Sequence, residues 1–516
     1  MPLLEKLSRL LLPASQAPLD YPFAASDVAQ YRLVAHADDS VLDGQTWNDL
    51  LLAQYSAVLA QETSIFGQQE LHRRLHGRAG ADAASMARVR ALLADPAQAL
   101  ALQQACSTLR HADCEVSATL WQHDIAETPR WTRWLPWLPI ALLASVVLAL
   151  ASAWPAVWLL VLACWAVLLG VQMRHHESMQ EWARQRSALQ QLLRSHAMLG
   201  GLTQPLAQEW QADAAEAARL NRLLATSPLA SLPGVAEYQD WLWLANVRHY
   251  FKSRAVVKTH RRWLRDSFAR MAALEADLAL ARHLRRQPRY CWAEQGDGLA
   301  FGQVVHPLLE QALPLDLQLA KRGAFISGQN GIGKSTLLRT VGLNLLTARA
   351  YGFCYAAQAS VVRLPVYASM QSEDALDQGV SLYLAELRRA RELLALAEQG
   401  RAVFIIDEIF RGTNHLESIS AAAAVLQCLS AQALVIVSSH NLVLAPLLQR
   451  ELEPWCVQRH QQCLQLMPGV LAQTNGIALL DTQGFDGAIA RRARQVFDWL
   501  SAYMAHPDEQ ELLLLL

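Results

Sequence analysis

The sequence predicts an α + α/β chain, in which a helical core domain, interrupted by an apolar helical hairpin, precedes a domain with a mostly parallel sheet. Three observations predict this fold: helical spacing of apolar residues in the first half, a long stretch without charge inside that half, and short apolar strands after residue 290. They divide the 516 residues into a leader (1–30), helical core (31–133), hairpin (134–173), second helical part (174–290), α/β domain (291–505) and tail (506–516).

Composition narrows the functional classes. The 45 basic and 46 acidic residues leave a net charge of −1, which does not indicate a chain built to bind nucleic acid over its whole surface, although a local basic face is compatible with it. The eight cysteines form no C-x-x-C pair and are typical of reduced thiols, not of a zinc site or a disulfide framework. Acidic Glu5 and a short leucine run before Pro13 make a poor secretory signal.

The first helical part shows amphipathic spacing. Thr46 begins a predicted helix whose apolar positions recur at Leu50, Leu51, Tyr55 and Leu59. Further helices are expected around residues 68–75 and 85–93. Core packing explains this periodicity without any active site.

The stretch from Trp134 to Met173 contains no charged residue. One membrane span needs about 20 apolar residues, so the stretch is long enough for two. Residues 152–155, Ser-Ala-Trp-Pro, offer a turn near its middle, and tryptophans 131, 134 and 137 cluster where interfacial aromatics belong. We predict a transmembrane hairpin with both ends in the cytoplasm, because arginines 130, 133 and 174 flank it. The alternative is a buried core hairpin of a large soluble protein.

Residues 246–289 are predicted to be helical and basic. The stretch carries Lys252, Arg254, Lys258, Arg261, Arg262, Arg265, Arg282, Arg285, Arg286 and Arg289. Such a basic stripe could meet the phosphates of DNA, anionic lipid headgroups, or only solvent. The sequence leaves these three interpretations open.

The α/β domain contains a phosphate-binding loop in its required context. An apolar run ending at Ser327 leads into Gly-x-x-x-x-Gly-Lys-Ser, residues 328–335, and a helical pattern follows. Gly328 and Gly333 let the backbone turn its N–H groups toward phosphate. Lys334 can reach the β- and γ-phosphates, and the Ser335 hydroxyl can ligate Mg²⁺. A glycine turn with a surface lysine is the alternative.

Two further strands end in polar residues. Residues 402–406 form a buried-type strand followed by Asp407 and Glu408, and residues 434–437 form another that leads to His440. After a P-loop, the first acid normally holds Mg²⁺ through water and the second activates the attacking water. His440 could sense the γ-phosphate, or it could be a plain helix-capping or solvated histidine.

A helix is predicted to begin near Ser381 and to end near Gly400. The preceding Gly379-x-Ser381 is suited to presenting N–H and hydroxyl groups to a phosphate. Helix caps use the same residues, so this signal is weak alone.

From about His306 to Leu500 the chain resembles the ATPase domain of the MutS family of mismatch-repair proteins. The resemblance rests on His306-Pro307, the P-loop with Asn330, Gly379-x-Ser381 with Glu386, Asp407-Glu408-Ile409-x-Arg411-Gly412-Thr413, His440, and the closing segments 475–478 and 490–494. ABC transporters have a distantly related layout but lack the Arg-Gly-Thr run. The segments 30–130 and 235–290 resemble the two parts of the family's helical core.

This resemblance implies an ATP- and Mg²⁺-dependent hydrolase that dimerises through its ATPase domain. The residues implied to hold phosphates and Mg²⁺ are Gly328, Asn330, Gly331, Gly333, Lys334, Ser335 and Thr336. It also implies that Asp407 holds the metal's water shell, that Glu408 is the general base and that His440 contacts the γ-phosphate or its water. Ser381 would act on the partner's nucleotide across the dimer interface.

Other family features are not found. Gln329, Gly331, Ile332 and Phe410 depart from the usual pattern, but none of these changes removes a catalytic group. No phenylalanine has Glu two residues later, as the mismatch-reading wedge requires, and the stretch before residue 30 is too short for the recognition domain. We therefore expect no mismatch discrimination.

Three functions follow as hypotheses. The first is a MutS-like ATPase in the cell (inner) membrane, multi-pass with cytoplasmic soluble parts, that binds double-stranded DNA non-specifically or a DNA-associated partner. The second is an ATP-driven switch acting on a membrane or protein partner without DNA contact. The third, an ABC-like transporter subunit, ranks last because the hairpin carries no intramembrane charge to line a substrate path.

Overall fold

The computed structural model of this chain describes residues 20–39, 41–78, 80–122, 125, 127–152, 154–226, 243–319, 322–370, 382–460, 463–471 and 475–505. The chain forms two compact units. A helical unit comprises Met1–Ser40 and Ser56–Gln287, and an α/β unit comprises Val41–Tyr55 and Pro288–Leu516. A short segment from the N-terminal half therefore belongs to the α/β unit. The predicted leader lies largely outside the described residues.

Two successive helices of the helical unit are capped at their N-termini by aspartate side chains. Asp82 accepts hydrogen bonds from the backbone N–H groups of Ala84 and Ser85, and Asp95 caps the next helix in the same way. The helices and short 3₁₀ turns are α2 (Ala25–Ala35), η1 (Ala37–Asp39), α4 (Leu52–Ala60), α5 (Ile65–His76), α6 (Ala83–Ala94), α7 (Pro96–Cys106), η2 (Ser107–His111), α8 (Ser117–Trp121), η3 (Arg130–Trp134), α9 (Trp137–Ala151), α10 (Val157–Gly200), η4 (Pro205–Ala207), α11 (Gln208–Gln211), α12 (Ala214–Leu224), α14 (Ala245–Thr259) and α15 (Arg261–Arg286). The helices expected at residues 68–75 and 85–93 are confirmed as α5 and α6.

The prediction of a single helix from Thr46 onward is wrong, because the structure has two helices there. Helix α3 covers Gly44–Asp49, Leu51 adopts a positive φ of 57°, and α4 begins at Leu52. Polar side chains of α3 bind the backbone of an edge strand in the α/β unit. The hydroxyl of Thr46 accepts from the N–H of Ala368 at 2.9 Å, and the carboxylate of Asp49 accepts from the N–H of Met370 at 2.8 Å. These contacts tie α3 to the sheet, so the chain turns before α4.

Helix α15 forms the centre of the helical unit. Phe268 is fully buried and packs edge-on against Phe66 and Trp121, with ring centroids 5.3 Å apart in both pairs. A buried ion pair joins Arg74 of α5 to Asp277 of α15 at 2.6 Å. Aromatic packing and paired charges thus hold α15 among its neighbours.

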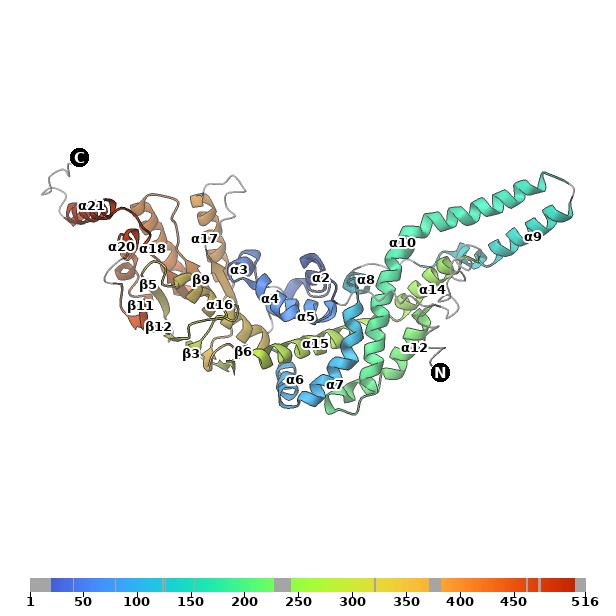
Figure 1. The fold of residues 1–516 in the computed structure, drawn as a ribbon, viewed down its shortest axis with the longest axis horizontal. Helices are drawn as coiled ribbons and strands as arrows, with labels where there is room; N and C mark the ends of the chain where they lie inside the picture. The colour runs from blue at the N-terminus through green and yellow to red at the C-terminus, as the bar shows by residue number, and fades with distance from the viewer. Residues whose placement is uncertain are drawn as a thin grey trace. The chain divides into compact units, whose positions relative to one another are not determined.

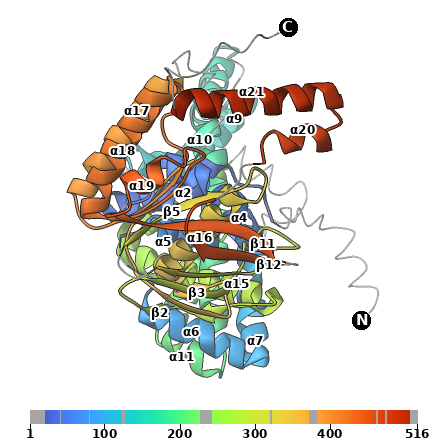
Figure 2. The same cartoon turned by 90° about the vertical axis from the view of Figure 1, so that its left-hand side faces the viewer.

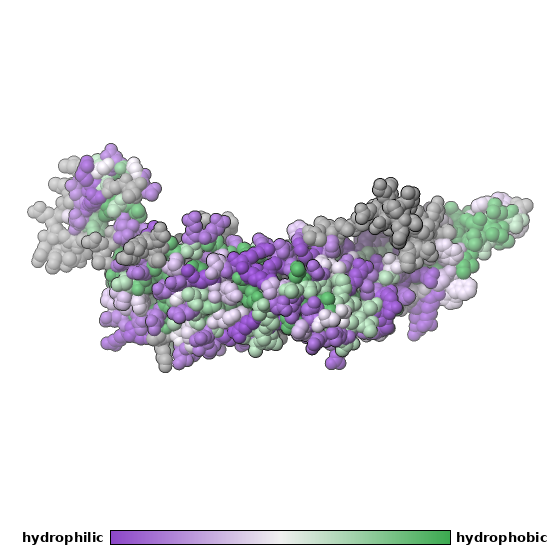
Figure 3. Space-filling view, turned by 60° about the horizontal axis from the view of Figure 1, so that its bottom comes forward, coloured by the Kyte–Doolittle hydropathy of each residue, from purple (hydrophilic) through white to green (hydrophobic). Residues whose placement is uncertain are grey.

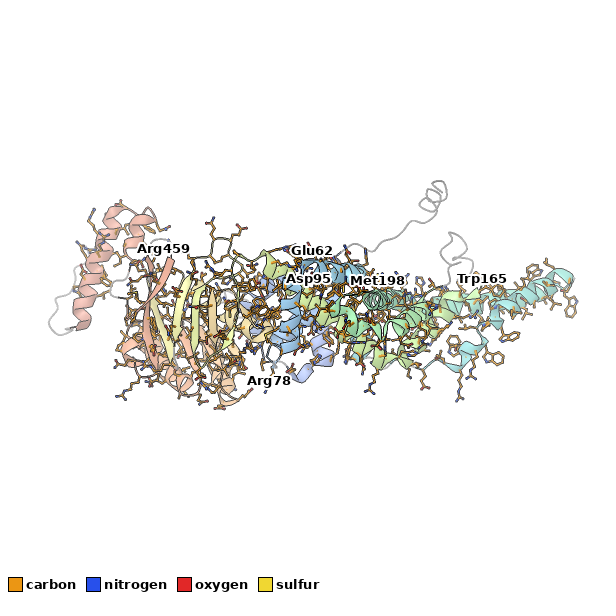
Figure 4. The ribbon with its side chains drawn as sticks, turned by 90° about the horizontal axis from the view of Figure 1, so that it is seen from below. Glu62, Arg78, Asp95, Trp165, Met198 and Arg459 are labelled. Atoms are coloured by element: carbon orange, nitrogen blue, oxygen red, sulfur yellow. The ribbon has the colours of Figure 1, made fainter. Side chains whose placement is uncertain are left out.

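Helices α9 and α10 form a hairpin that projects from the helical unit (Figure 1). The turn predicted at residues 152–155 lies between them, with Ala153 outside the described residues. Figure 3 shows apolar surface gathered on this projection, and Trp165 lies on it while Met198 lies farther along the same helix, within the helical unit (Figure 4). Among the described helices, Val157–Gly200 alone is both long and apolar enough to cross a membrane, and Trp137–Ala151 is a shorter apolar helix.

The hairpin is apolar without being buried. Only 11% of the most apolar 18-residue window of α10 is covered by the rest of the protein. Leu150, Trp154 and Leu159 are 73%, 76% and 67% exposed. The core hairpin of a soluble protein would have these side chains covered, so packing within this chain does not explain them.

The α/β unit contains a ten-stranded sheet in which most neighbouring pairs are parallel. The strand order is β2-β7-β3-β4-β12-β11-β5-β10-β9-β8, and β1 pairs with β6 in a separate two-stranded sheet. The strands are β1 (Cys291–Trp292), β2 (Glu294–Gln295), β3 (Leu299–Val304), β4 (Leu315–Leu319), β5 (Gly323–Gly328), β6 (Phe353–Cys354), β7 (Gln358–Val361), β8 (Val366–Ser369), β9 (Val403–Asp407), β10 (Leu434–Ser438), β11 (Leu452–His460) and β12 (Cys463–Pro468). The strands predicted at 402–406 and 434–437 are confirmed as β9 and β10.

Helices cover both faces of the parallel strands (Figure 2). Alternate residues of β9 separate the faces: Phe404 packs in a core with α17–α19, whereas Ile405 lies close to Gly342 of α16. The helices are α16 (Lys334–Tyr351), α17 (Leu382–Glu398), α18 (His415–Gln432), α19 (Leu444–Leu447), α20 (Ala478–Thr482) and α21 (Gly487–Ala505). The predicted helix ending near Gly400 is therefore confirmed as α17. Burial on both faces explains why β9 and β10 are continuous apolar runs.

Candidate functional site

Three neighbouring parallel strands bring the predicted site residues to one edge of the sheet. Strand β10 lies between β5 and β9, with Ser438 level with Ile326 on one side and Asp407 on the other. The carboxyl ends of parallel strands lie at the same sheet edge, where open α/β folds bind ligands. The P-loop, the acidic pair and His440 follow these three strands and therefore meet.

The P-loop leads from β5 directly into α16. Gly331 and Gly333 have φ angles of 76° and 102°, which glycine adopts readily, and a Cβ at either position would point into open space. Lys334 is only 7% exposed, and its ammonium donates to the carbonyls of Gly328 at 3.0 Å and Gln329 at 3.4 Å. Burial lowers the pKa of Lys334, and the nearby carboxylates of Glu408 and Asp407 oppose that shift. The alternative of a surface lysine is wrong.

The tip of the P-loop is held by a residue that sequence reasoning placed only in the family's closing segment. The side-chain oxygen of Asn475 accepts from the N–H of Asn330 at 2.8 Å, and its amide donates back to the Asn330 carbonyl at 3.3 Å. This reciprocal pair orders the loop from a segment far along the chain. No local sequence signal indicates the contact.

The acidic pair lies at the end of β9. Asp407 is 5% exposed and accepts a hydrogen bond from the Ser438 hydroxyl. Glu408 follows in a left-handed conformation, φ 55°, with its N–H bonded to the Ser438 carbonyl at 3.0 Å. Such a conformation costs a non-glycine residue of the order of 1 kcal/mol or more and is characteristic of functional sites.

Both oxygens of Glu408 have a basic side chain within hydrogen-bond distance. His440 Nε2 lies 2.8 Å from one oxygen, and Arg411 Nε lies 3.2 Å from the other. Burial alone would raise the pKa of Glu408, but the hydrogen bond and charge of His440, followed by Arg411 and Lys334, lower it overall. Glu408 is therefore an anion at neutral pH, as a general base must be.

Comparison with known proteins agrees with this geometry. Residues 324–501 match the family described as MutS domain V. The DNA mismatch repair protein MutS of Thermus thermophilus is 26% identical over 254 residues, which cover 46% of this chain and 31% of that protein. The endonuclease MutS2 of the same species is 32% identical over 170 residues, 32% of this chain and 21% of MutS2. The matched part of this chain is thus similar to MutS-family proteins.

The match is partial in both directions. A MutS from Lachnoclostridium phytofermentans is 26% identical over 218 residues, or 38% of this chain and 23% of that protein. The chain thus spans about a third or less of the length of these curated relatives. The part that matches the family description includes the P-loop, the acidic pair and His440.

MutS-family ATPases use ATP with Mg²⁺, and the residues at this site fit both. The open space before Gly331 and Gly333 lies beside a buried ammonium that donates to loop carbonyls, and this arrangement suits a polyphosphate. The half-buried Ser335 hydroxyl has no partner within the described ranges, and Asp407 has oxygen ligands of the kind Mg²⁺ prefers. Lys334, Ser335, Thr336 and Asp407 would hold the nucleotide and its metal.

Glu386 of α17 positions the loop that carries Arg411. Its carboxylate accepts from the backbone N–H groups of Arg411 at 2.9 Å and Gly412 at 3.3 Å. Gly412 is required here, because a Cβ would lie 2.5 Å from the Tyr383 backbone nitrogen. The sequence places Glu386 in a family motif but does not indicate this contact. Ser381, predicted to act across a dimer, lies outside the described residues together with Gly379.

A cavity of about 300 Å³ lies beside the acidic pair. Its polar lining includes Arg411, Thr413, His415, Ser439 and His440. Sequence reasoning did not single out His415, which begins α18. The cavity leaves room for water or a ligand next to the Glu408 carboxylate.

The basic stripe of residues 246–289 is used mainly within the protein. Arg261 and Arg265 donate to the Leu120 carbonyl at 2.5 and 2.6 Å, at the C-terminus of α8. Arg285 donates to the Leu92 carbonyl in the last turn of α6, and Arg282 to the Gln61 carbonyl just after α4. Unpaired carbonyls and the helix dipole make helix C-termini natural partners of arginine. None of the three interpretations of the stripe anticipated this internal role.

Proposed function

We propose that this chain is a membrane-anchored MutS-like ATPase, which couples ATP binding and hydrolysis in a homodimer to the binding of DNA or a DNA-associated partner. The observation that carries the proposal is the meeting of Lys334, the acidic pair and His440 at one sheet edge. An ATP-driven switch for a membrane or protein partner is the second candidate.

The residues divide the work of hydrolysis among themselves. Lys334 would neutralise charge on the phosphates, and Ser335 and Asp407 would hold Mg²⁺ beside them. Bound Mg²⁺ supplies Lewis acidity toward phosphoryl oxygens. Glu408 orients water and accepts its proton once His440 or Arg411 releases a carboxylate oxygen. His440, 49% exposed, can then turn toward the γ-phosphate or its water.

Dimerisation would complete the site. MutS-family proteins function as dimers that bind DNA, and Ser381 belongs to the motif that would meet the partner's nucleotide. Arg411 and Thr413 line the cavity beside Glu408, so a neighbouring subunit placed there would influence the base directly. Exchange of partners at Glu408 would link ATP turnover to the state of the dimer.

Membrane anchoring through α9 and α10 accounts for their exposed apolar surface. Tryptophans occupy both ends of the hairpin: Trp134 and Trp137 near its base, and Trp154 at its turn. Interfacial tryptophans at both ends are typical of a span. With arginines flanking its base, the hairpin would keep both soluble parts in the cytoplasm and locate the protein in the cell (inner) membrane.

The first limb of the hairpin is short. Helix α9 has 15 residues and is therefore roughly 22 Å long, against a hydrocarbon thickness of about 30 Å. Local thinning of the bilayer and the flanking tryptophans can accommodate the difference. The proposal therefore includes a bilayer that is thinned around this protein.

DNA binding would rest on phosphate contacts, which carry no information on sequence or mismatches. We therefore expect matched and mismatched duplexes to bind alike. One observation favours the second candidate. Arg261, Arg265, Arg282 and Arg285 donate hydrogen bonds to backbone carbonyls of the same unit, so these guanidinium groups are less available to contact DNA phosphates. Exposed Lys252 and Arg262 form no hydrogen bond or ion pair within the described ranges.

The deciding experiment is a titration of the detergent-purified protein with fluorescent duplexes, matched and mismatched, with and without ATP at two salt concentrations. Weak, salt-sensitive and ATP-modulated binding of both duplexes supports the first function. Preference for the mismatched duplex contradicts it. ATP hydrolysis without DNA binding at low salt favours the second candidate. Anchoring is tested separately, since the protein should stay with membranes after an alkaline wash.

A further inference from the structure

A second cavity lies at the base of the hairpin, entirely within the helical unit. Its volume is about 280 Å³, and it is lined by the segment before α9, by α10 just after its apolar part, and by α14. The principal lining side chains are Trp131, Arg174, His175, Tyr250, Phe251 and Arg254. The cavity therefore sits where the uncharged stretch Trp134–Met173 ends.

Two arginines supply the charge of this base cavity. Arg174 is exposed and forms no hydrogen bond or ion pair within the described ranges. Arg254 is half-buried, donates to the Tyr250 hydroxyl at 2.6 Å, and lies over the rings of Tyr250 and Trp182 at 5.1 and 5.9 Å. Among the described residues neither arginine has a carboxylate partner, in contrast to the arginines that elsewhere pair with acids or cap helices. Guanidinium groups without such a partner are suited to bind phosphate.

The acidic group at the rim does not cancel this charge. Glu127 is 92% exposed on its side chain and lies 3.6 Å from the ammonium of Lys258. Glu127 is thus paired with a lysine that does not line the cavity. Burial, followed by the charge of Arg174, lowers the pKa of His175, so this ring is neutral at pH 7 and can offer a hydrogen bond. The net charge of the lining is positive.

Aromatic rings form the wall on the hairpin side. The Trp131 indole stacks on His175 at 5.8 Å and meets Phe251 edge-on at 5.5 Å, yet Trp131 is still 40% exposed. An amphipathic indole beside arginines is typical of the bilayer interface, where the glycerol and phosphate of a lipid lie. The volume suits a headgroup more than a whole lipid, because pockets for drug-sized ligands begin at about 300 Å³.

We infer that the base cavity binds the phosphate of an anionic phospholipid, with Arg174 and Arg254 as its ligands and Trp131 beside the glycerol. This inference rests on the membrane anchoring in the proposed function. Cationic pockets next to a span are sites for anionic headgroups, because the pocket and the acyl chains are engaged by the same lipid. Binding there would fix the height of the hairpin in the bilayer.

The test is lipid retention by the full chain. The protein is reconstituted into nanodiscs of phosphatidylcholine alone or with phosphatidylglycerol, then released into detergent, and its bound lipids are counted by native mass spectrometry. Wild type should retain phosphatidylglycerol over phosphatidylcholine. Arg174→Gln with Arg254→Gln should reduce that preference at least about tenfold, because two charge-assisted hydrogen bonds are lost. Arg174→Gln alone, which disturbs no contact within the described ranges, should give part of the loss.

A matched control removes the same charge elsewhere. Lys252→Gln with Arg262→Gln alters two exposed cations of the same unit and should leave the preference unchanged. Equal loss in this control, or full retention in the Arg174/Arg254 variant, overturns the inference. Glycerol 3-phosphate added in detergent tests whether the ligand is a soluble phosphate ester and not a lipid. If it binds as tightly as the lipid, the lipid assignment is wrong. Failure to enter nanodiscs at all would instead contradict the anchoring.

Discussion

Basic side chains do opposite work in the two units. In the α/β unit, Lys334 is buried and, among the described residues, its ammonium donates only to two loop carbonyls, so its charge is available to a ligand. In the helical unit, Arg261 and Arg265 converge on one carbonyl at the end of α8, so their hydrogen bonds serve the fold. A strand–loop–helix motif such as the P-loop therefore identifies a functional lysine better than a cluster of basic residues on a helix does.

The largest expected effect is at the acidic pair. Glu408→Gln should retain ATP binding but reduce hydrolysis by about 100-fold or more, because general-base catalysis contributes 10²–10⁴. Lys334→Ala should lose nucleotide binding as well. Phosphate release and fluorescent-nucleotide binding measure the two separately. Parental turnover in Glu408→Gln would show that another group is the base.

The helix-capping arginines provide the contrasting test. Arg261→Ala with Arg265→Ala should lower the free energy of unfolding by about 2–3 kcal/mol, since each charged hydrogen bond contributes about 1.5–3 kcal/mol before solvent exposure is considered. The exposed Arg262→Ala is the matched control and should be nearly neutral. Denaturant unfolding followed by tryptophan fluorescence measures both. If the double variant is as stable as wild type and loses only DNA binding, these arginines contact DNA and the capping role is wrong.

Glu386 tests positioning within the α/β unit. Glu386→Ala frees the backbone N–H groups of Arg411 and Gly412, and so should disturb the Arg411–Glu408 pair. We expect kcat to fall about tenfold with little change in KM, as for loss of an interaction made in the transition state. Glu386→Gln retains an acceptor and should recover most of the rate. A change confined to KM would mean that Glu386 acts on nucleotide binding.

The last test concerns pH and Asp49. Burial raises the pKa of Asp49 to about 6 from 3.8 in the unfolded chain, and the Met370 N–H and nearby arginines oppose that shift. The folded state therefore binds the proton more tightly, and stability falls as pH rises from about 4 to 6. Asp49→Asn keeps the acceptor and should gain up to about 3 kcal/mol over wild type at pH 7 but not at pH 4. A pH-independent difference would contradict a buried, titrating carboxylate.

Much of the α/β unit was predictable from local sequence. Residues 402–406 and 434–437 are continuous apolar runs because both faces of β9 and β10 are covered, and the P-loop spacing places Gly333 and Lys334 at the start of α16. The contacts of Asn475 with the P-loop and of Glu386 with the Arg411 loop were not predictable. They join segments distant in the chain, and an asparagine or glutamate shows no local sign of its partner.

The sequence by itself determined the strand–loop–helix context of the P-loop, the acidic pair, and an uncharged stretch long enough for two helices, because each depends on neighbours along the chain. Only the tertiary structure decided that α3 breaks away to bind β8, that arginines of α15 cap other helices, and that Glu408 is held by His440 and Arg411. The reason is physical: a buried or paired charge is defined by what surrounds it in space, and residues far apart in sequence provide those surroundings.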